Sequence, residues 1–146
     1  MPDKNNYQTD VSTAERHNGT DCIRLLLVDD EKGFADVLSK RMAKRNINVT
    51  KAYNGTEAIQ ILRRHDFDLA LLDLKMEDMD GIEVLKIFRK MDPGLSVIML
   101  TGHGSENAAK EGLKCGAIDY LTKPCDFDEL IKKINEIHKG RGGADG

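Results

Sequence analysis

The chain has 146 residues, of which 40% are hydrophobic, and its formal net charge is −3. This length and apolar content suffice for one globular domain and exclude a wholly disordered chain. The slight negative charge gives no general reason to expect nucleic-acid binding. Because no apolar stretch reaches membrane length and no leader-like segment stands near the amino end, we expect a cytoplasmic protein.

The cysteines and histidines do not form a recognisable framework. Three cysteines, an odd number, lie without Cys-x-x-Cys spacing at positions 22, 115 and 125. This pattern favours reduced thiols over disulfides or a zinc site. Cys125 lies two residues past Lys123, and a redox role for it stays open.

The first half of the chain predicts a tail followed by two strand–helix pairs. Residues 1–21 are polar and are expected to form a flexible tail. The apolar run 23–28 predicts a strand, and a helix over about 33–45 carries a stripe of Phe34, Val37, Leu38 and Met42. A strand over 48–53 follows, and then a helix to about residue 64, for which Asn54 and Glu57 form a capping-box signature.

The second half repeats this alternation three times. Strands are predicted at 69–72, 96–100 and 120–122, and helices over about 81–90, 105–114 and 126–138. The helix that Ser105 would cap is the weakest, because it contains Gly112 and few large apolar residues. The Gly-rich segment 140–146 is expected to be a tail or linker, which leaves a domain over 22–139.

Strands that alternate with helices of this length indicate a parallel sheet. The runs 23–28 and 69–72 are almost continuously apolar, as expected of central strands covered on both faces. Right-handed crossovers then give a doubly wound α/β domain of three layers, with five strands and five helices.

Polar residues of particular types stand at the carboxyl ends of four predicted strands: Asp29, Asp30, Asp73, Thr101 and Lys123. Ligands of open α/β sheets bind at this edge, so we expect these side chains to share one cleft. Taken singly, each has an ordinary explanation. The acidic run after the first strand could begin a helix, and Asp73 could be an ion-pair or capping residue.

Together these residue types suit phosphoryl transfer. Paired carboxylates repel each other, and a hard cation such as Mg²⁺ relieves that repulsion. A carboxylate such as Asp73 can act as a nucleophile and form an aspartyl phosphate. Lys123 would supply positive charge and pair with Asp73 at rest, and Thr101 could donate to a phosphoryl oxygen. Pro124 would fix the turn that aims Lys123, through a trans or a cis bond.

The region from about residue 21 to 138 resembles the receiver domain of two-component response regulators. Five segments carry the resemblance: Leu-Leu-Val-Asp-Asp-Glu (26–31), Leu-Leu-Asp-Leu-Lys-Met (71–76), Met-Asp-Gly (79–81), Met-Leu-Thr-Gly-His-Gly (99–104) and Gly-Ala-Ile-Asp-Tyr-Leu-Thr-Lys-Pro (116–124). The resemblance implies a flavodoxin-like fold with strand order 2-1-3-4-5. It also implies that the chain is a phosphorylated signalling switch rather than an enzyme acting on external substrates.

The resemblance also implies residue roles. Asp73 would accept a phosphoryl group from a sensor histidine kinase or a histidine phosphotransfer protein. Asp30 and Asp73 would bind Mg²⁺ directly, Asp29 mainly through water, and Lys75 through its backbone carbonyl. Thr101 and Tyr120 would form the switch pair, with the Tyr120 ring passing from exposed to buried.

Two positions that tune phosphoryl lifetime in this family are Lys75 and His103 here. The chain departs from the family at Glu77, where proline is frequent. With Asp78 and Asp80, Glu77 makes that loop acidic.

Residues of about 105–138 are the expected output face, which would bind a protein target or support a phosphorylation-dependent homodimer. We expect no direct nucleic-acid or membrane binding by this domain. A stand-alone receiver is favoured because the chain starts with Met and has its own tail; the alternative is the receiver part of a longer transcriptional regulator. An aspartyl-phosphate phosphatase is disfavoured, because Lys75 occupies the place of its second aspartate.

Overall fold

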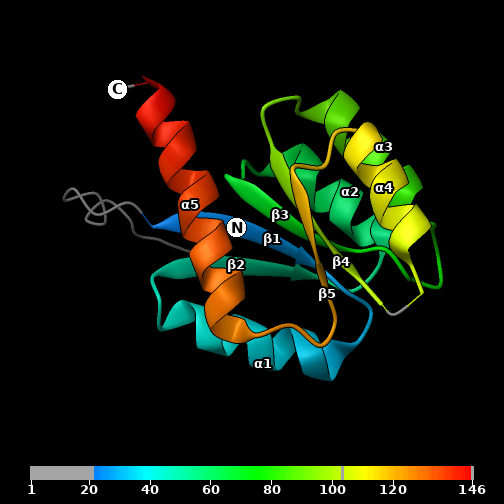
Figure 1. Ribbon diagram of the computed structural model, residues 1–146, viewed down its shortest axis with the longest axis horizontal. Helices are drawn as coiled ribbons and strands as arrows, with labels where there is room; N and C mark the ends of the chain where they lie inside the picture. The colour runs from blue at the N-terminus through cyan, green and yellow to red at the C-terminus, as the bar shows by residue number, and fades with distance from the viewer. Residues whose placement is uncertain (1–21, 103, 146) are drawn as a thin grey trace.

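The computed structural model describes residues 22–102 and 104–145, with side chains described as far as residue 140. Strands and helices alternate through this part of the chain (Figure 1). In order they are β1 (Ile23–Val28), α1 (Lys32–Ala43), β2 (Ile47–Ala52), α2 (Gly55–Arg64), β3 (Leu69–Asp73), α3 (Gly81–Met91), β4 (Ser96–Thr101), α4 (Glu106–Lys114), β5 (Asp119–Thr122) and α5 (Phe127–Asp145). The expected tail over 1–21 lies outside the described residues.

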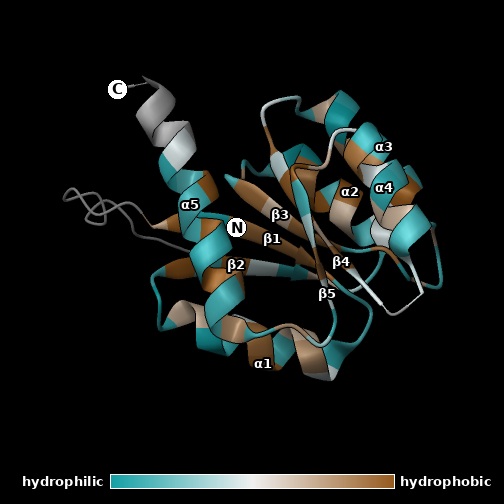
Figure 2. Cartoon of the chain, viewed as in Figure 1, coloured by the Kyte–Doolittle hydropathy of each residue, from teal (hydrophilic) through white to brown (hydrophobic). Residues whose placement is uncertain are grey.

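The five strands of the described chain form one parallel sheet in the order β2-β1-β3-β4-β5. This confirms the predicted fold class and strand order. Helices α1 and α5 cover one face of the sheet, and α2, α3 and α4 cover the other (Figure 1). Figure 2 shows the apolar residues gathered along the strands between these layers.

Alternation along the central strands supplies both halves of the core. Leu25 and Leu27 of β1 pack toward α1 and α5, whereas Leu26 and Val28 pack toward α2 and α3. All four side chains are fully buried. Each buried leucine stabilises the fold by about 2 kcal/mol relative to an exposed one, so the apolar runs of the sequence hold the sheet at the centre of the domain.

The apolar stripe predicted for α1 is wrong at one position. Val37 is 60% exposed, and Ala35 takes the inward place together with Leu38 and Met42. The inward face follows the spacing i, i+3 and i+7, and Val37 is rotated about 100° from Leu38.

The helix ends differ in how they are capped. The Asn54 side chain accepts a hydrogen bond from the Glu57 backbone N–H at 2.7 Å, as the sequence predicts. The Glu57 carboxylate accepts from the N–H of Tyr53 at 2.7 Å, one residue earlier than in the standard capping box. Ser105 does precede α4, but its side chain makes no capping hydrogen bond among the described residues.

Helix α5 continues to Asp145, so residues 140–145 of the expected tail or linker are helical. A helical glycine costs about 1 kcal/mol relative to alanine, which weakens a helix without forbidding it. In the described part of the chain, no helix is both long enough and apolar enough to cross a membrane.

Candidate functional site

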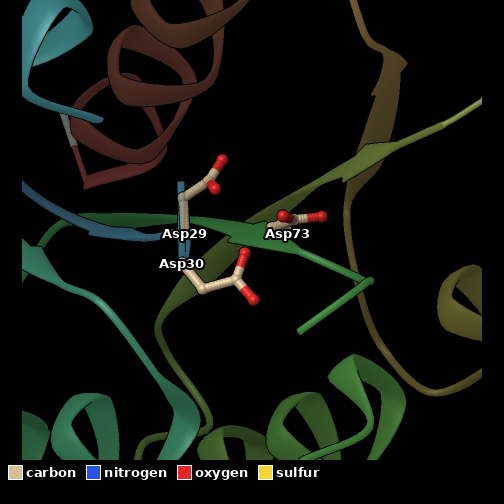
Figure 3. Close-up of side chains that lie close together, drawn as sticks. All are labelled: Asp29, Asp30 and Asp73. Carbon is tan, nitrogen blue, oxygen red and sulfur yellow. The ribbon is translucent and has the colours of Figure 1, made fainter. Parts of the chain in front are cut away.

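Three carboxylates converge at the carboxyl edge of the sheet. Asp29 and Asp30 directly follow β1, and Asp73 ends β3 beside it (Figure 3). One oxygen atom from each lies within 4.8 Å of the others. Thr101 ends β4, and Lys123 follows β5, whose last residue pairs with Thr101. The structure therefore gathers at one edge the five residues that the sequence analysis predicted there.

The pleat of the strands divides these side chains between the two faces of the sheet. Asp29, Asp73 and Lys123 each follow by two residues a leucine that packs against α1 and α5: Leu27, Leu71 and Leu121. Asp30 and Thr101 instead follow residues of the opposite core, Val28 and Met99. Side chains two apart along a strand share a face, so the site takes residues from both faces at their common edge.

Backbone and lysine donors hold Asp29, which is fully buried. One oxygen accepts from the N–H of Glu31 at 2.9 Å, and the other accepts from the Lys123 ammonium at 2.9 Å. In contrast, Asp73 accepts one backbone hydrogen bond, from Lys75 at 3.0 Å, and Asp30 accepts one, from Glu77 at 3.2 Å. Asp30 and Asp73 each retain an oxygen that no described N–H or ammonium group contacts at hydrogen-bonding distance.

Burial raises the pKa of Asp73 to about 6. The negative charge of Asp29 adds to this increase, whereas the Lys75 N–H and the Lys123 ammonium oppose it. Desolvation favours the neutral acid, and a second carboxylate nearby favours it further. At neutral pH the Asp73 carboxylate is therefore an anion in an unfavourable environment, and a bound cation would stabilise it.

Lys123 lies among three carboxylates. Its ammonium nitrogen is 2.8 Å from Glu31 Oε1, 2.9 Å from Asp29 Oδ2 and 3.6 Å from Asp73 Oδ2. Although burial opposes the charged form, hydrogen bonds to Glu31 and Asp29 raise the pKa of Lys123. The expected resting pair with Asp73 is thus only a longer contact. The Lys123–Pro124 bond is cis.

Three further residues of the predicted site lie in the described part of the chain. Thr101 is buried, and its hydroxyl donates to the Leu121 carbonyl at 3.4 Å. The Tyr120 side chain is 39% exposed, and Lys75 is also exposed. His103 lies outside the described residues.

Two neighbouring residues were not predicted from the sequence as contacts of the site. Glu31 binds Lys123, and Asp78 ties the loop after β3 to the start of α2. Asp78 accepts from the N–H groups of Gly55 at 3.0 Å and Thr56 at 3.1 Å, and these bonds outweigh the desolvation of its carboxylate and lower its pKa. Acidic residues after the strands were visible in the sequence, but their partners are 92 and 23 positions away.

The carboxylate set fits a hard divalent cation. Mg²⁺ prefers carboxylate oxygens and keeps several waters, so it requires few protein ligands. Asp30 and Asp73 have oxygens available as direct ligands, whereas both Asp29 oxygens already accept protein hydrogen bonds. This difference supports an indirect contribution from Asp29.

A model of the response regulator receiver domain matches residues 25–135. The chain belongs to the response regulator receiver domain family. Among solved structures, a CheY-like receiver domain protein from Methanospirillum hungatei has a TM-score of 0.81 and 31% sequence identity, covering 85% of this chain and 99% of that one. The receiver domain is a signalling switch of two-component phosphorelay systems, and the recognition from sequence is confirmed.

Curated relatives of this receiver domain are of two kinds. The transcriptional regulatory protein ZraR of Klebsiella oxytoca is 39% identical over 114 residues, covering 78% of this chain and 26% of that protein. The sporulation initiation phosphotransferase F of Bacillus subtilis is 36% identical over 113 residues, covering 77% of this chain and 91% of that protein. The chain thus spans about a quarter of the length of the first kind.

Proposed function

We propose that Asp73 accepts a phosphoryl group from a phosphohistidine of a sensor kinase or phosphotransfer protein, in a reaction that depends on Mg²⁺. The observation that carries this proposal is the meeting of three carboxylates within 4.8 Å beside the partly buried ammonium of Lys123. Asp30, Asp73 and the Lys75 carbonyl would hold the cation, with Asp29 contributing through water.

The transfer is a displacement at phosphorus. An oxygen of the Asp73 carboxylate attacks the phosphorus atom, a new O–P bond forms, and the N–P bond to the donor histidine breaks. The departing imidazole nitrogen keeps the electron pair and takes up a proton. When bound, Mg²⁺ would neutralise charge on the carboxylates and the phosphoryl oxygens.

The chain's own residues would position and stabilise the transferred group. Lys123 would contact one phosphoryl oxygen, and Thr101 would turn its hydroxyl from Leu121 toward another. Tyr120 would then move inward. Lys75 and His103 would set how long the acyl phosphate survives, through the access they allow to water.

The output would lie on the face formed by about residues 105–138, where Leu113, Ile118 and Tyr120 are exposed apolar side chains. The two kinds of relatives support two settings: a stand-alone receiver in a phosphorelay and the receiver part of a longer transcriptional regulator. Amide NMR spectra recorded with Mg²⁺, before and after adding beryllofluoride, would map this face. Sedimentation of the same samples would detect an activation-dependent homodimer.

Phosphorylation by a small donor tests the proposed reaction. With phosphoramidate and Mg²⁺, the intact mass of the protein should rise by one phosphoryl group, and hydroxylamine should remove that group. Asp73→Asn should gain nothing. Equal gain by Asp73→Asn, or none by the wild type, would contradict the proposal. Steady turnover of p-nitrophenyl phosphate would favour the phosphatase alternative.

A further inference from the structure

Glu31 is the most exposed carboxylate that contacts Lys123. Its side chain is 64% exposed, whereas Asp29 is fully buried and Asp73 is 8% exposed. It also forms the shortest of the three contacts, 2.8 Å from Glu31 Oε1 to the ammonium nitrogen. Glu31 directly follows the acidic pair in the sequence.

A lysine ammonium has three hydrogen-bond donors, and Lys123 faces three carboxylates at rest. Two of these donors bind Asp29 and Glu31, and the third faces Asp73 at the longer distance of 3.6 Å. A phosphoryl group on Asp73 brings several acceptor oxygens, so any contact with Lys123 beyond this third donor requires the release of an existing partner. Releasing Asp29 would leave a fully buried charge without its ammonium partner, which is costly. Releasing Glu31 costs little, because water solvates an exposed carboxylate.

The other contacts of Lys123 lie on the same side of the site as Glu31. The ammonium lies 4.4 Å from the centre of the Phe34 ring, on the first turn of α1. Glu31 immediately precedes that helix and forms no side-chain capping bond there. Its carboxylate is therefore committed to Lys123, and both contacts hold the ammonium on the α1 side of the site.

We propose that Glu31 is a positioning residue that tethers Lys123 in the resting state, and that release of this tether is part of activation. The inference rests on the proposed function, because it assumes that Lys123 contacts the phosphoryl group. Glu31 would therefore lower the affinity of the site for a phosphoryl group, because both compete for the ammonium of Lys123.

Beryllofluoride, a mimic of the aspartyl phosphate, tests this competition. Its affinity in Mg²⁺ would be measured by amide NMR titration for the wild type, Glu31→Gln and Glu31→Asp. Aspartate keeps the charge but is shorter by one methylene, so it loses the reach to Lys123. Both variants should bind beryllofluoride about two- to fivefold more tightly than the wild type, the range set by exposed ion pairs.

Glu77→Gln is the matched control. It removes the same charge from the same edge of the site, and among the described residues its carboxylate has no contact with Lys123. Its affinity should stay within twofold of the wild type.

Three results would overturn the tether: unchanged affinity in both Glu31 variants, tightening in Glu31→Gln alone, or equal tightening in Glu77→Gln. The second and third would assign the effect to charge rather than contact. A wild type that binds Mg²⁺ but not beryllofluoride would instead overturn the proposed function, and the tether with it.

Discussion

The first turns of α2 and α4 are held in different ways. Side-chain oxygens of Asp78 and Asn54 accept from the first three backbone N–H groups of α2, over Gly55–Glu57. At the start of α4, Ser105 offers no such bond among the described residues. Unpaired N–H groups of a first turn depend on water, so protein side chains hold the first turn of α2, whereas no described side chain caps that of α4.

The side chains at the ends of β1 and β3 are likewise held by shorter hydrogen bonds than that of Thr101, which ends β4. Asp29 and Asp73 are buried and oriented by backbone N–H groups at 2.9 and 3.0 Å, whereas the Thr101 hydroxyl makes one long bond of 3.4 Å. Tyr120 is 39% exposed. The half of the site that would hold the cation is preorganised, and the half that would respond to phosphorylation is held by few bonds. Three pairs of measurements bear on this difference.

The largest expected effect comes from two helical glycines, one in each half. A Cβ atom on Gly81 would lie 2.5 Å from Leu74 Cα, which is backbone of the loop after Asp73. A Cβ atom on Gly112 would overlap Met99 Sδ, which belongs to a flexible thioether side chain. We expect Gly81→Ala to lower the free energy of unfolding by about 3 kcal/mol.

Gly112→Ala should cost about 1 kcal/mol or less, because methionine can move and alanine favours the helix. Urea denaturation measures both variants. Equal losses would show that the two halves are packed with equal rigidity.

The next effect is the pH dependence of Asp73→Asn in metal-free protein. The pKa of Asp73 is about 6 in the fold against 3.8 for an ordinary aspartate. Between these values the folded state binds more protons than the unfolded state, so the penalty for burying the anion is absent below pH 4 and complete above pH 6. The variant should be more stable than the wild type by about 2 kcal/mol at pH 8, with no gain below pH 4.

Thermal unfolding at both pH values measures this difference, and Mg²⁺ provides the control. Added Mg²⁺ should stabilise the wild type more than Asp73→Asn, because the variant loses one carboxylate ligand. A gain that stayed the same at pH 4 and pH 8 would mean that the charge of Asp73 is not its source.

The smallest effect compares two caps. Asp78→Ala should destabilise the protein by about 1 kcal/mol, because it removes the acceptor for the N–H groups of Gly55 and Thr56. Ser105→Ala should leave the free energy of unfolding unchanged, because its side chain forms no cap. Chemical denaturation of both variants checks the difference, and a cost for Ser105→Ala would remove the contrast between α2 and α4.

The fold was predictable because its signals are local. Apolar runs, helical spacing and the cap at Asn54 each depend on residues within a few positions, and they located the strands and helices. The strand order, which the structure confirms, was implied by the resemblance to receiver domains. The clustering of Asp29, Asp30 and Asp73 was predictable because ligands of open α/β sheets bind at the carboxyl ends of the strands.

The contacts that the sequence did not predict join residues that lie far apart in the chain. No residue near Glu31 in the sequence indicates that its carboxylate binds Lys123, 92 residues later. Nor does the sequence indicate that Lys123 lies closer to Glu31 than to Asp73. Val37 has the right chemistry for the core of α1 but the wrong rotation. Gly112 was interpreted as a weakness of α4, whereas the structure shows that it makes room for Met99.

The pleat that divides the site between the two faces has a further consequence. The backbone of a parallel sheet separates its two faces, so side chains on one face cannot contact side chains on the other. At the carboxyl edge of the sheet this separation ends: Asp73, on the α1 and α5 side, and Thr101, on the α4 side, end neighbouring strands. A chemical event on one side can therefore reach side chains of the other side across this edge, and the proposed phosphorylation site lies there.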